Sequence, residues 1–124
     1  MAEDDPLIAR FLGGSLTGAG FTVTHVGDGE SALEALKQQS YGCVILDLNM
    51  PKLDGYGVVE AMRQQAKTQS TPVLILSLRS QENDIIRAFD LGADDYVSKP
   101  FSPLEVISRI RRLMVRANQL QSRG

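Results

Sequence analysis

The chain has 124 residues, of which 43% are hydrophobic, with a formal net charge of -2 and a single cysteine. This length allows one hydrophobic core and excludes two ordinary domains, and one cysteine excludes a disulfide framework or a cysteine-based metal site. The charge argues against a nucleic-acid-binding surface, no apolar run approaches the roughly 18 residues of a membrane span, and no signal peptide is evident. We therefore expect one cytoplasmic domain at residues 1–117 and a polar tail or linker at 118–124.

Apolar, β-branched segments alternate with segments of helical period, which is typical of an α/β fold with a parallel sheet. Asp5 and Pro6 have the form of a helix cap and first helical residue, and Gly18 has that of a stop. In chain order we expect a helix at 6–18, a strand at 21–26, a helix at 30–39, a strand at 43–47, a helix at 56–66, a strand at 72–77, a helix at 81–91, a strand at 95–98 and, after the capping box that opens at Ser102, a helix to about Ala117.

One strand is missing from this pattern. A doubly wound sheet needs a strand that leads into Glu3-Asp4-Asp5, but only Met1 and Ala2 precede that run. Its four or five apolar side chains would contribute about 1.5–3 kcal/mol each. We expect the chain to be several kcal/mol less stable than a version with that strand, and Glu3 and Asp4 to lie on a fraying terminus. Three outcomes stay open: the flanking strands close up, another chain fills the gap, or the domain is marginal.

Three polar features point to one edge of the sheet. Asp47 ends an apolar strand, the acidic run Glu3-Asp4-Asp5 precedes a helix, and Lys99 follows the strand at 95–98. Open α/β sheets hold their chemistry at the carboxyl ends of the strands. Acids, a nucleophilic carboxylate and a lysine at that edge suggest a divalent metal and a phosphoryl group, so we interpret Asp47 as a residue that accepts phosphate.

Together these motifs resemble the receiver domain of two-component response regulators, the CheY-like family. The resemblance covers Glu3 to about Ala117 and is carried, in order, by the segments 3–6, 46–51 with 54–55, 76–77 and 92–101. It implies a flavodoxin-like, doubly wound parallel sheet of strand order 2-1-3-4-5, with strand 1 largely absent. It further implies a phosphoacceptor switch rather than an enzyme.

The resemblance assigns roles to individual residues. Asp47 matches the phosphoacceptor, which takes phosphate from a sensor histidine kinase, and Lys99 matches the lysine that pairs first with Asp47 and then with the phosphoryl group. Ser77 and Tyr96 match the two switch residues, and Pro100 matches the position of a cis peptide. The expected Mg²⁺ ligands are Glu3, Asp4, Asp47 and the backbone carbonyl of Asn49, because hard oxygen ligands suit Mg²⁺.

The segment from Gly92 to Arg116 resembles the OmpR/PhoB-type subfamily, whose receivers dimerise through the fourth helix, fifth strand and fifth helix and carry a winged-helix DNA-binding domain. The resemblance implies a homodimer on phosphorylation, with ion pairs among Asp94, Asp95, Glu105, Arg109 and Arg116. Ile85 stands where the subfamily has a basic residue, so one pair is lost. Residues 1–124 as a whole are expected to contact neither nucleic acid nor membrane directly.

A second interpretation is a phosphorylation-independent dimerisation or interaction module with a degraded metal site. A third, an aspartyl phosphohydrolase, needs a general acid two residues after Asp47, where Asn49 cannot donate and recover a proton. We interpret His25 as a surface residue away from the acidic corner and Asp54 as a helix cap. Leu78, which replaces an alanine of the family, could crowd the path of Ser77 and Tyr96.

Overall fold

The computed structural model describes residues 1–78 and 82–123. Within these, the elements in chain order are α1 (Pro6–Gly18), α2 (Gly29–Gln38), β1 (Val44–Asp47), α3 (Gly55–Arg63), β2 (Val73–Ser77), α4 (Glu82–Leu91), β3 (Asp95–Ser98) and α5 (Pro103–Arg123). Asp5 caps α1 by accepting the N–H groups of Leu7 and Ile8, and Asp54 caps α3 by accepting that of Gly57. Both caps confirm the predictions from sequence.

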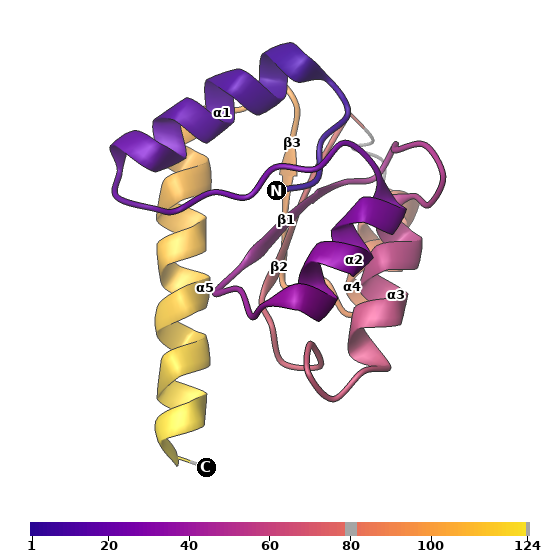
Figure 1. Ribbon diagram of the computed structural model, residues 1–124, viewed down its shortest axis with the longest axis vertical. Helices are drawn as coiled ribbons and strands as arrows, with labels where there is room; N and C mark the ends of the chain where they lie inside the picture. The colour runs from indigo at the N-terminus through magenta and orange to yellow at the C-terminus, as the bar shows by residue number, and fades with distance from the viewer. Residues whose placement is uncertain (79–81, 124) are drawn as a thin grey trace.

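Three parallel strands form the sheet in the order β1-β2-β3. Helices α2, α3 and α4 cover one face and α1 and α5 cover the other (Figure 1). Side chains alternate between the two cores, since Leu46 and Ile75 point to the first face while Ile45 and Leu74 point to the second. Because helices cover both faces, β1 and β2 are buried along their whole length.

The expected strand at 21–26 does not form within the described chain, and that prediction is wrong. Only Val26 pairs, through a parallel bridge with Ala2, which also bridges Leu46. A strand needs a continuous neighbour for its backbone groups, and here the neighbour consists of Met1 and Ala2. The terminus itself is held on both sides: Ala2 N–H donates to Ile45 O at 2.8 Å and the Met1 ammonium donates to Thr24 O at 2.8 Å.

Helix ends differ from the expected ones in two places. Helix α3 ends at Arg63 rather than near residue 66, and α5 continues to Arg123, six residues beyond the expected end at Ala117. No glycine or proline stands between Ala117 and Gly124, so α5 meets no stop signal there. The other predicted elements agree within one or two residues, and the expected first residue of α4, at position 81, lies outside the described residues.

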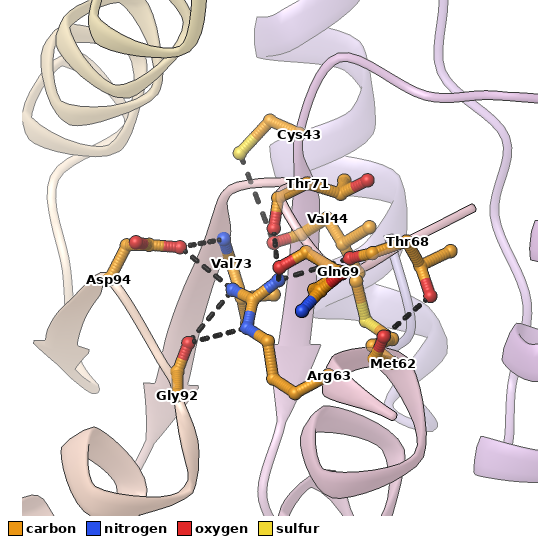
Figure 2. A network of polar contacts seen from close by, with 10 residues as sticks. All are labelled: Cys43, Val44, Met62, Arg63, Thr68, Gln69, Thr71, Val73, Gly92 and Asp94. Atoms are coloured by element: carbon orange, nitrogen blue, oxygen red, sulfur yellow. Dashed lines mark hydrogen bonds and ion pairs between the residues drawn. The ribbon is translucent and has the colours of Figure 1, made fainter. Parts of the chain in front are cut away.

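At the amino-terminal edge of the sheet, Arg63 gathers several backbone segments (Figure 2). Its guanidinium donates to the carbonyls of Thr68, Gln69, Thr71 and Gly92 and to the carboxylate of Asp94. Asp94 also accepts the N–H of Val73 at 2.8 Å. Gly92 has φ 114°, and a Cβ there would lie 2.7 Å from Arg63 Cγ, so this turn requires glycine. We call Arg63, Asp94 and their partners the arginine clasp.

Candidate functional site

The predicted site residues meet at the carboxyl-terminal edge of the sheet. Asp47 ends β1, Ser77 ends β2, and Lys99 directly follows β3. The N–H of Lys99 donates to Ser77 O at 2.8 Å, which fixes the lysine beside β2, and the Lys99-Pro100 peptide is cis, as expected. Glu3 is anchored next to β1, since Asp47 N–H donates to Ala2 O at 3.0 Å.

Lys99 joins two buried carboxylates. Its Nζ lies 2.6 Å from Glu3 Oε1 and 2.9 Å from Asp47 Oδ2. Glu3 is 1% exposed and Asp47 is 4% exposed, so this is a buried triad rather than a surface ion pair. The other oxygen of Asp47, Oδ1, accepts the N–H of Asn49 at 2.9 Å. Buried charges at such distances must be paired, and Lys99 supplies the pairing.

The pKa values of the two buried carboxyl groups, Glu3 and Asp47, are shifted in opposite directions. Burial, followed by the neighbouring Asp47, raises the pKa of Glu3 to about 8. Burial alone would raise the pKa of Asp47 as well, but hydrogen bonds with Glu3, the Asn49 N–H and Lys99 outweigh it and hold that pKa below its ordinary value. The pKa of Lys99 is raised, because its bonds to Glu3 and Asp47 outweigh the effect of burial. Asp47 is therefore ionised and available as a nucleophile at neutral pH.

The acidic cluster fits a divalent cation. Carboxylate oxygens of Glu3, Asp4 and Asp47 lie within 4.8 Å of one another. Glu3 Oε2 is buried and has no hydrogen-bond partner among the described residues, which leaves an oxygen with a lone pair to fill. Three carboxylates against one ammonium leave up to two negative charges, and hard oxygen donors suit Mg²⁺.

The expectation that Glu3 lies on a fraying terminus is wrong, because Glu3 is buried and its N–H donates to Val26 O at 3.1 Å.

A cleft opens directly over this cluster. Its volume is about 640 Å³, which is in the range of small-molecule sites. Asp4, Asp47, Asn49 and Lys99 form its polar floor, and its apolar walls are Ile8, Phe11, Leu78 and Phe101. Leu78, one of these lining residues, is 72% exposed.

The two expected switch residues share a face of the sheet. Tyr96 pairs in register with Ile75, and Ser77 lies two residues further along β2, so both side chains face the α3–α4 side. Ser77 is fully buried, and the hydroxyl oxygen of Tyr96 is buried as well. A hydroxyl at the strand end and an aromatic ring behind it therefore lie on the side from which α4 covers the sheet.

The expected dimer-face residues do not form a single cluster within the chain. Arg109 contacts Asp95 at 2.9 Å and Glu105 at 3.2 Å within the same chain, and Arg112 adds a contact to Asp95 at 3.3 Å. Arg116 is exposed. Asp94 lies apart from them in the arginine clasp. A single chain does not test a dimer, so the intermolecular pairing remains a prediction.

Two positioning features were not predicted. His25 Nε2 lies 2.8 Å from the backbone oxygen of Glu3, so His25 borders the acidic corner rather than lying away from it. A Cβ at Gly55 would lie 2.6 Å from Asp47 O, so only glycine lets α3 begin this close to the site. No local residue pattern indicates the histidine contact, whereas Asp54-Gly55, shortly after the strand that Asp47 ends, indicates a helix start near Asp47.

Comparisons with known proteins agree with this geometry. The family model described as the response regulator receiver domain matches residues 1–111. A probable transcriptional regulator, ycf27, from Porphyridium aerugineum is 41% identical over 120 residues, which are 97% of this chain and 49% of that protein. The chain thus spans about half the length of the curated relatives it matches.

Solved structures show the same fold. The receiver domain of the Francisella response regulator 1452 has a TM-score of 0.87 and 36% identity, with 93% of each chain covered. The receiver domain of a sensor histidine kinase from Pseudomonas aeruginosa, with a magnesium ion coordinated in the active-site cleft, has a TM-score of 0.85 and 28% identity over 91% of this chain and 93% of that one. In the described part of this chain, no helix is long and apolar enough to cross a bilayer.

Proposed function

This chain belongs to the response regulator receiver family, and on that premise we propose that Asp47 accepts a phosphoryl group from a sensor histidine kinase. The observation that carries the proposal is the buried triad of Glu3, Asp47 and Lys99, of which Asp47 and Lys99 line an open cleft. As a receiver domain of two-component signalling, the protein is a phosphoacceptor switch rather than an enzyme.

In the proposed reaction, a carboxylate oxygen of Asp47 attacks the phosphorus of a phosphohistidine. The new O–P bond makes an acyl phosphate, the P–N bond breaks, and its electron pair leaves with the imidazole. The Asn49 N–H holds Asp47 Oδ1 in place. Lys99 Nζ, which contacts Asp47 Oδ2, would pair with the transferred phosphoryl oxygens. Positioning and charge are the main contributions that phosphoryl transfer needs from the protein.

Glu3, Asp4, Asp47 and the backbone carbonyl of Asn49 would hold Mg²⁺. The bound ion would offset the negative charge of the carboxylates and of the incoming phosphoryl group. The buried, unpartnered Glu3 Oε2 supports this ligand set, as does the magnesium ion in the cleft of the related Pseudomonas aeruginosa receiver. Lys99 contacts both Glu3 and Asp47, so its positive charge offsets part of the negative charge of the cluster.

Phosphorylation would then bias the positions of Ser77 and Tyr96, and through them the surface of α4, β3 and α5. We further propose that this surface forms a homodimer, in which Asp95 and Arg109 exchange their internal pairing for an intermolecular one. Exposed ion pairs contribute only about 0–1 kcal/mol each, so the dimer should be weak and sensitive to salt. Sedimentation of the beryllofluoride-bound protein at low salt should show the dimer; monomers under those conditions would contradict it.

The decisive experiment is phosphorylation by acetyl phosphate with Mg²⁺. Asp47→Asn should abolish acid-labile labelling, because an amide is a poor nucleophile. Asp54→Asn is the matched control: it changes a neighbouring carboxylate in the same way, but asparagine also caps helices, so labelling should persist. Undiminished labelling of the Asp47→Asn protein would sink the site assignment.

A second experiment separates the switch from a phosphorylation-independent interaction module. Beryllofluoride with Mg²⁺ should shift the amide resonances around Ser77 and Tyr96 in the wild type. Lys99→Ala should keep part of the labelling but lose these shifts, because it removes the charge that pairs with the phosphoryl group. Unchanged spectra of the wild type would favour the interaction module.

A further inference from the structure

The backbone oxygen of Glu3 lies where the parallel pairing with Val26 stops. Val26 N–H donates to Met1 O at 3.0 Å, and Glu3 N–H donates to Val26 O at 3.1 Å. Because the bonds of a parallel ladder repeat every two residues, the next donor, to Glu3 O, would be the N–H of Asp28. The chain turns into α2 there, and Asp28 is the cap of that helix. Among the described residues, Glu3 O therefore receives no backbone N–H.

The side chain of His25 supplies the donor that the ladder lacks. Its Nε2 lies 2.8 Å from Glu3 O, and because a carbonyl oxygen can only accept, this nitrogen carries the proton. The carbonyl group of Glu3 and the nitrogen and Cα of Asp4 lie in one plane. The hydrogen bond from His25 therefore fixes the peptide group that joins the two acidic residues.

The carboxylate of Asp4 depends on that peptide group more than its neighbours do. Lys99 holds the carboxylates of Glu3 and Asp47. Asp4 is exposed, and within the described part of the chain its carboxylate has no hydrogen bond or ion pair. Its position is set by the backbone on either side, which is the Glu3–Asp4 peptide before it and the α1 cap, Asp5, after it.

His25 itself lies outside the cleft. The cleft is lined by Asp4, Asp47 and Lys99, among others, and His25 is not one of its lining residues. The histidine borders a separate hollow, beside Pro6. Its contribution is therefore to hold a peptide that carries ligands, and not to bind a cation or a phosphoryl group itself.

From these contacts we propose that His25 is a positioning residue for the cation site, because its hydrogen bond to Glu3 O holds the Glu3–Asp4 peptide so that Asp4 is presented to Mg²⁺. The inference rests on the proposed function, in which Glu3 and Asp4 are ligands of the ion. Groups that orient metal ligands raise the affinity, because the ligands are ordered before the ion binds. A single net hydrogen bond corresponds to about three- to tenfold in affinity.

The test compares two amide side chains at position 25. The amide nitrogen of glutamine lies as far from Cβ as Nε2 of histidine does, whereas that of asparagine lies closer to the backbone. Mg²⁺ is titrated into the wild type and both variants at one pH, and the Asn49 amide resonance reports binding, since that N–H contacts Asp47 Oδ1. His25→Asn should raise the dissociation constant about three- to tenfold, and His25→Gln should keep it within about twofold of the wild-type value.

Urea midpoints without Mg²⁺ are measured on the same three proteins. A purely structural contact would lower the midpoint of His25→Asn and leave the dissociation constant of the folded protein unchanged. Equal dissociation constants for the wild type and His25→Asn would therefore overturn the proposal. So would a dissociation constant of His25→Gln as weak as that of His25→Asn, because a donor within reach would then make no difference.

Failure of the positioning role can be told apart from failure of the proposed function. If the wild type binds Mg²⁺ and is labelled by acetyl phosphate at Asp47 while both substitutions leave the dissociation constant unchanged, only the role of His25 is wrong. If the wild type binds no Mg²⁺, the ligand set and the role of His25 are both wrong. Weaker binding in His25→Asn, with recovery in His25→Gln, supports the proposal.

Discussion

The two edges of the sheet solve the problem of buried polar groups in different ways. At the amino-terminal edge, the guanidinium of Arg63 is shared among four backbone carbonyls and one carboxylate, and Asp94 in turn accepts a backbone N–H. At the carboxyl-terminal edge, one lysine serves two buried carboxylates, and Glu3 Oε2 has no partner among the described residues.

This difference in pairing suggests that the amino-terminal edge serves stability and the carboxyl-terminal edge serves ligand binding. In the arginine clasp, opposite charges and carbonyl dipoles satisfy one another and hold α3, the 68–71 loop and the α4–β3 turn together (Figure 2). At the triad, two buried carboxyl groups share one ammonium and Glu3 Oε2 has no partner among the described residues, which is a cost that a bound cation can relieve. We therefore expect substitutions at the clasp to change folding, and substitutions at the triad to change ligand and proton binding.

The largest effect on stability is expected from Arg63→Ala. The substitution removes all the guanidinium donors of the clasp and should lower the free energy of unfolding by about 2–4 kcal/mol. Urea denaturation measures it. Lys67→Ala is the control, because Lys67 is exposed and its ammonium donates, among the described residues, only to Lys37 O. Its effect should be about 0.5 kcal/mol or less. Equal effects of the two substitutions would show that the clasp is not a special support.

A pH effect of comparable or somewhat smaller size is expected at Glu3. Because folding raises its pKa to about 8 from the model-compound value of 4.5, protonated Glu3 stabilises the fold fully below about pH 4.5, and this is lost as the pH rises through 8. Without Mg²⁺, the unfolding free energy of the wild type relative to Glu3→Gln should fall by roughly 2–4 kcal/mol between pH 5 and 9. The Met1 amine, whose pKa burial lowers to about 6, cancels in this difference. If the difference in unfolding free energy between the wild type and Glu3→Gln did not change with pH, the raised pKa of Glu3 would be contradicted.

Mg²⁺ should stabilise only the carboxyl-terminal edge. At ten times its dissociation constant it should add about 1.4 kcal/mol to the unfolding free energy, and the same amount to Arg63→Ala. Asp4→Asn should reduce the gain at the same Mg²⁺ concentration, because it weakens one exposed ligand without disturbing the buried triad. Urea midpoints with and without Mg²⁺ measure this. A loss of the response in Arg63→Ala would show that the two edges are coupled.

The smallest effect is expected at the other multiply paired arginine, Arg109. Its contacts are to the side chains of Asp95 and Glu105, its own side chain is 34% exposed, and Arg112 remains beside Asp95. Arg109→Ala should lower the unfolding free energy by less than about 1 kcal/mol, and high salt should reduce that loss. A loss as large as that of Arg63→Ala would refute the view that backbone carbonyls distinguish the clasp.

Local patterns predicted much of the fold and of the site. Asp5 with Pro6, Asp54 and Gly92 gave correct helix ends, and the polar residues after three apolar strands met at one edge as expected. Features that depend on distant partners were missed. Residues 21–26 alternate like a strand, but within the described chain they pair only with Met1 and Ala2. The acceptors of Arg63 lie as far away along the chain as Asp94. No local signal in the chain indicates either contact.

Helix α5 is long enough for a small rotation at its first residue to cause a large displacement of its last. Its 21 residues correspond to about 31 Å of length, and the helix projects past the body of the protein in Figure 1. It begins four residues after Lys99, beside the cleft, while its far end lies beyond the sheet. A tilt of the α5 axis by about ten degrees at Pro103 would displace its far end by about 5 Å. That displacement is several times the range of donor–acceptor distances over which a hydrogen bond persists. A small adjustment around the lysine can thus become a large change of position at a distance.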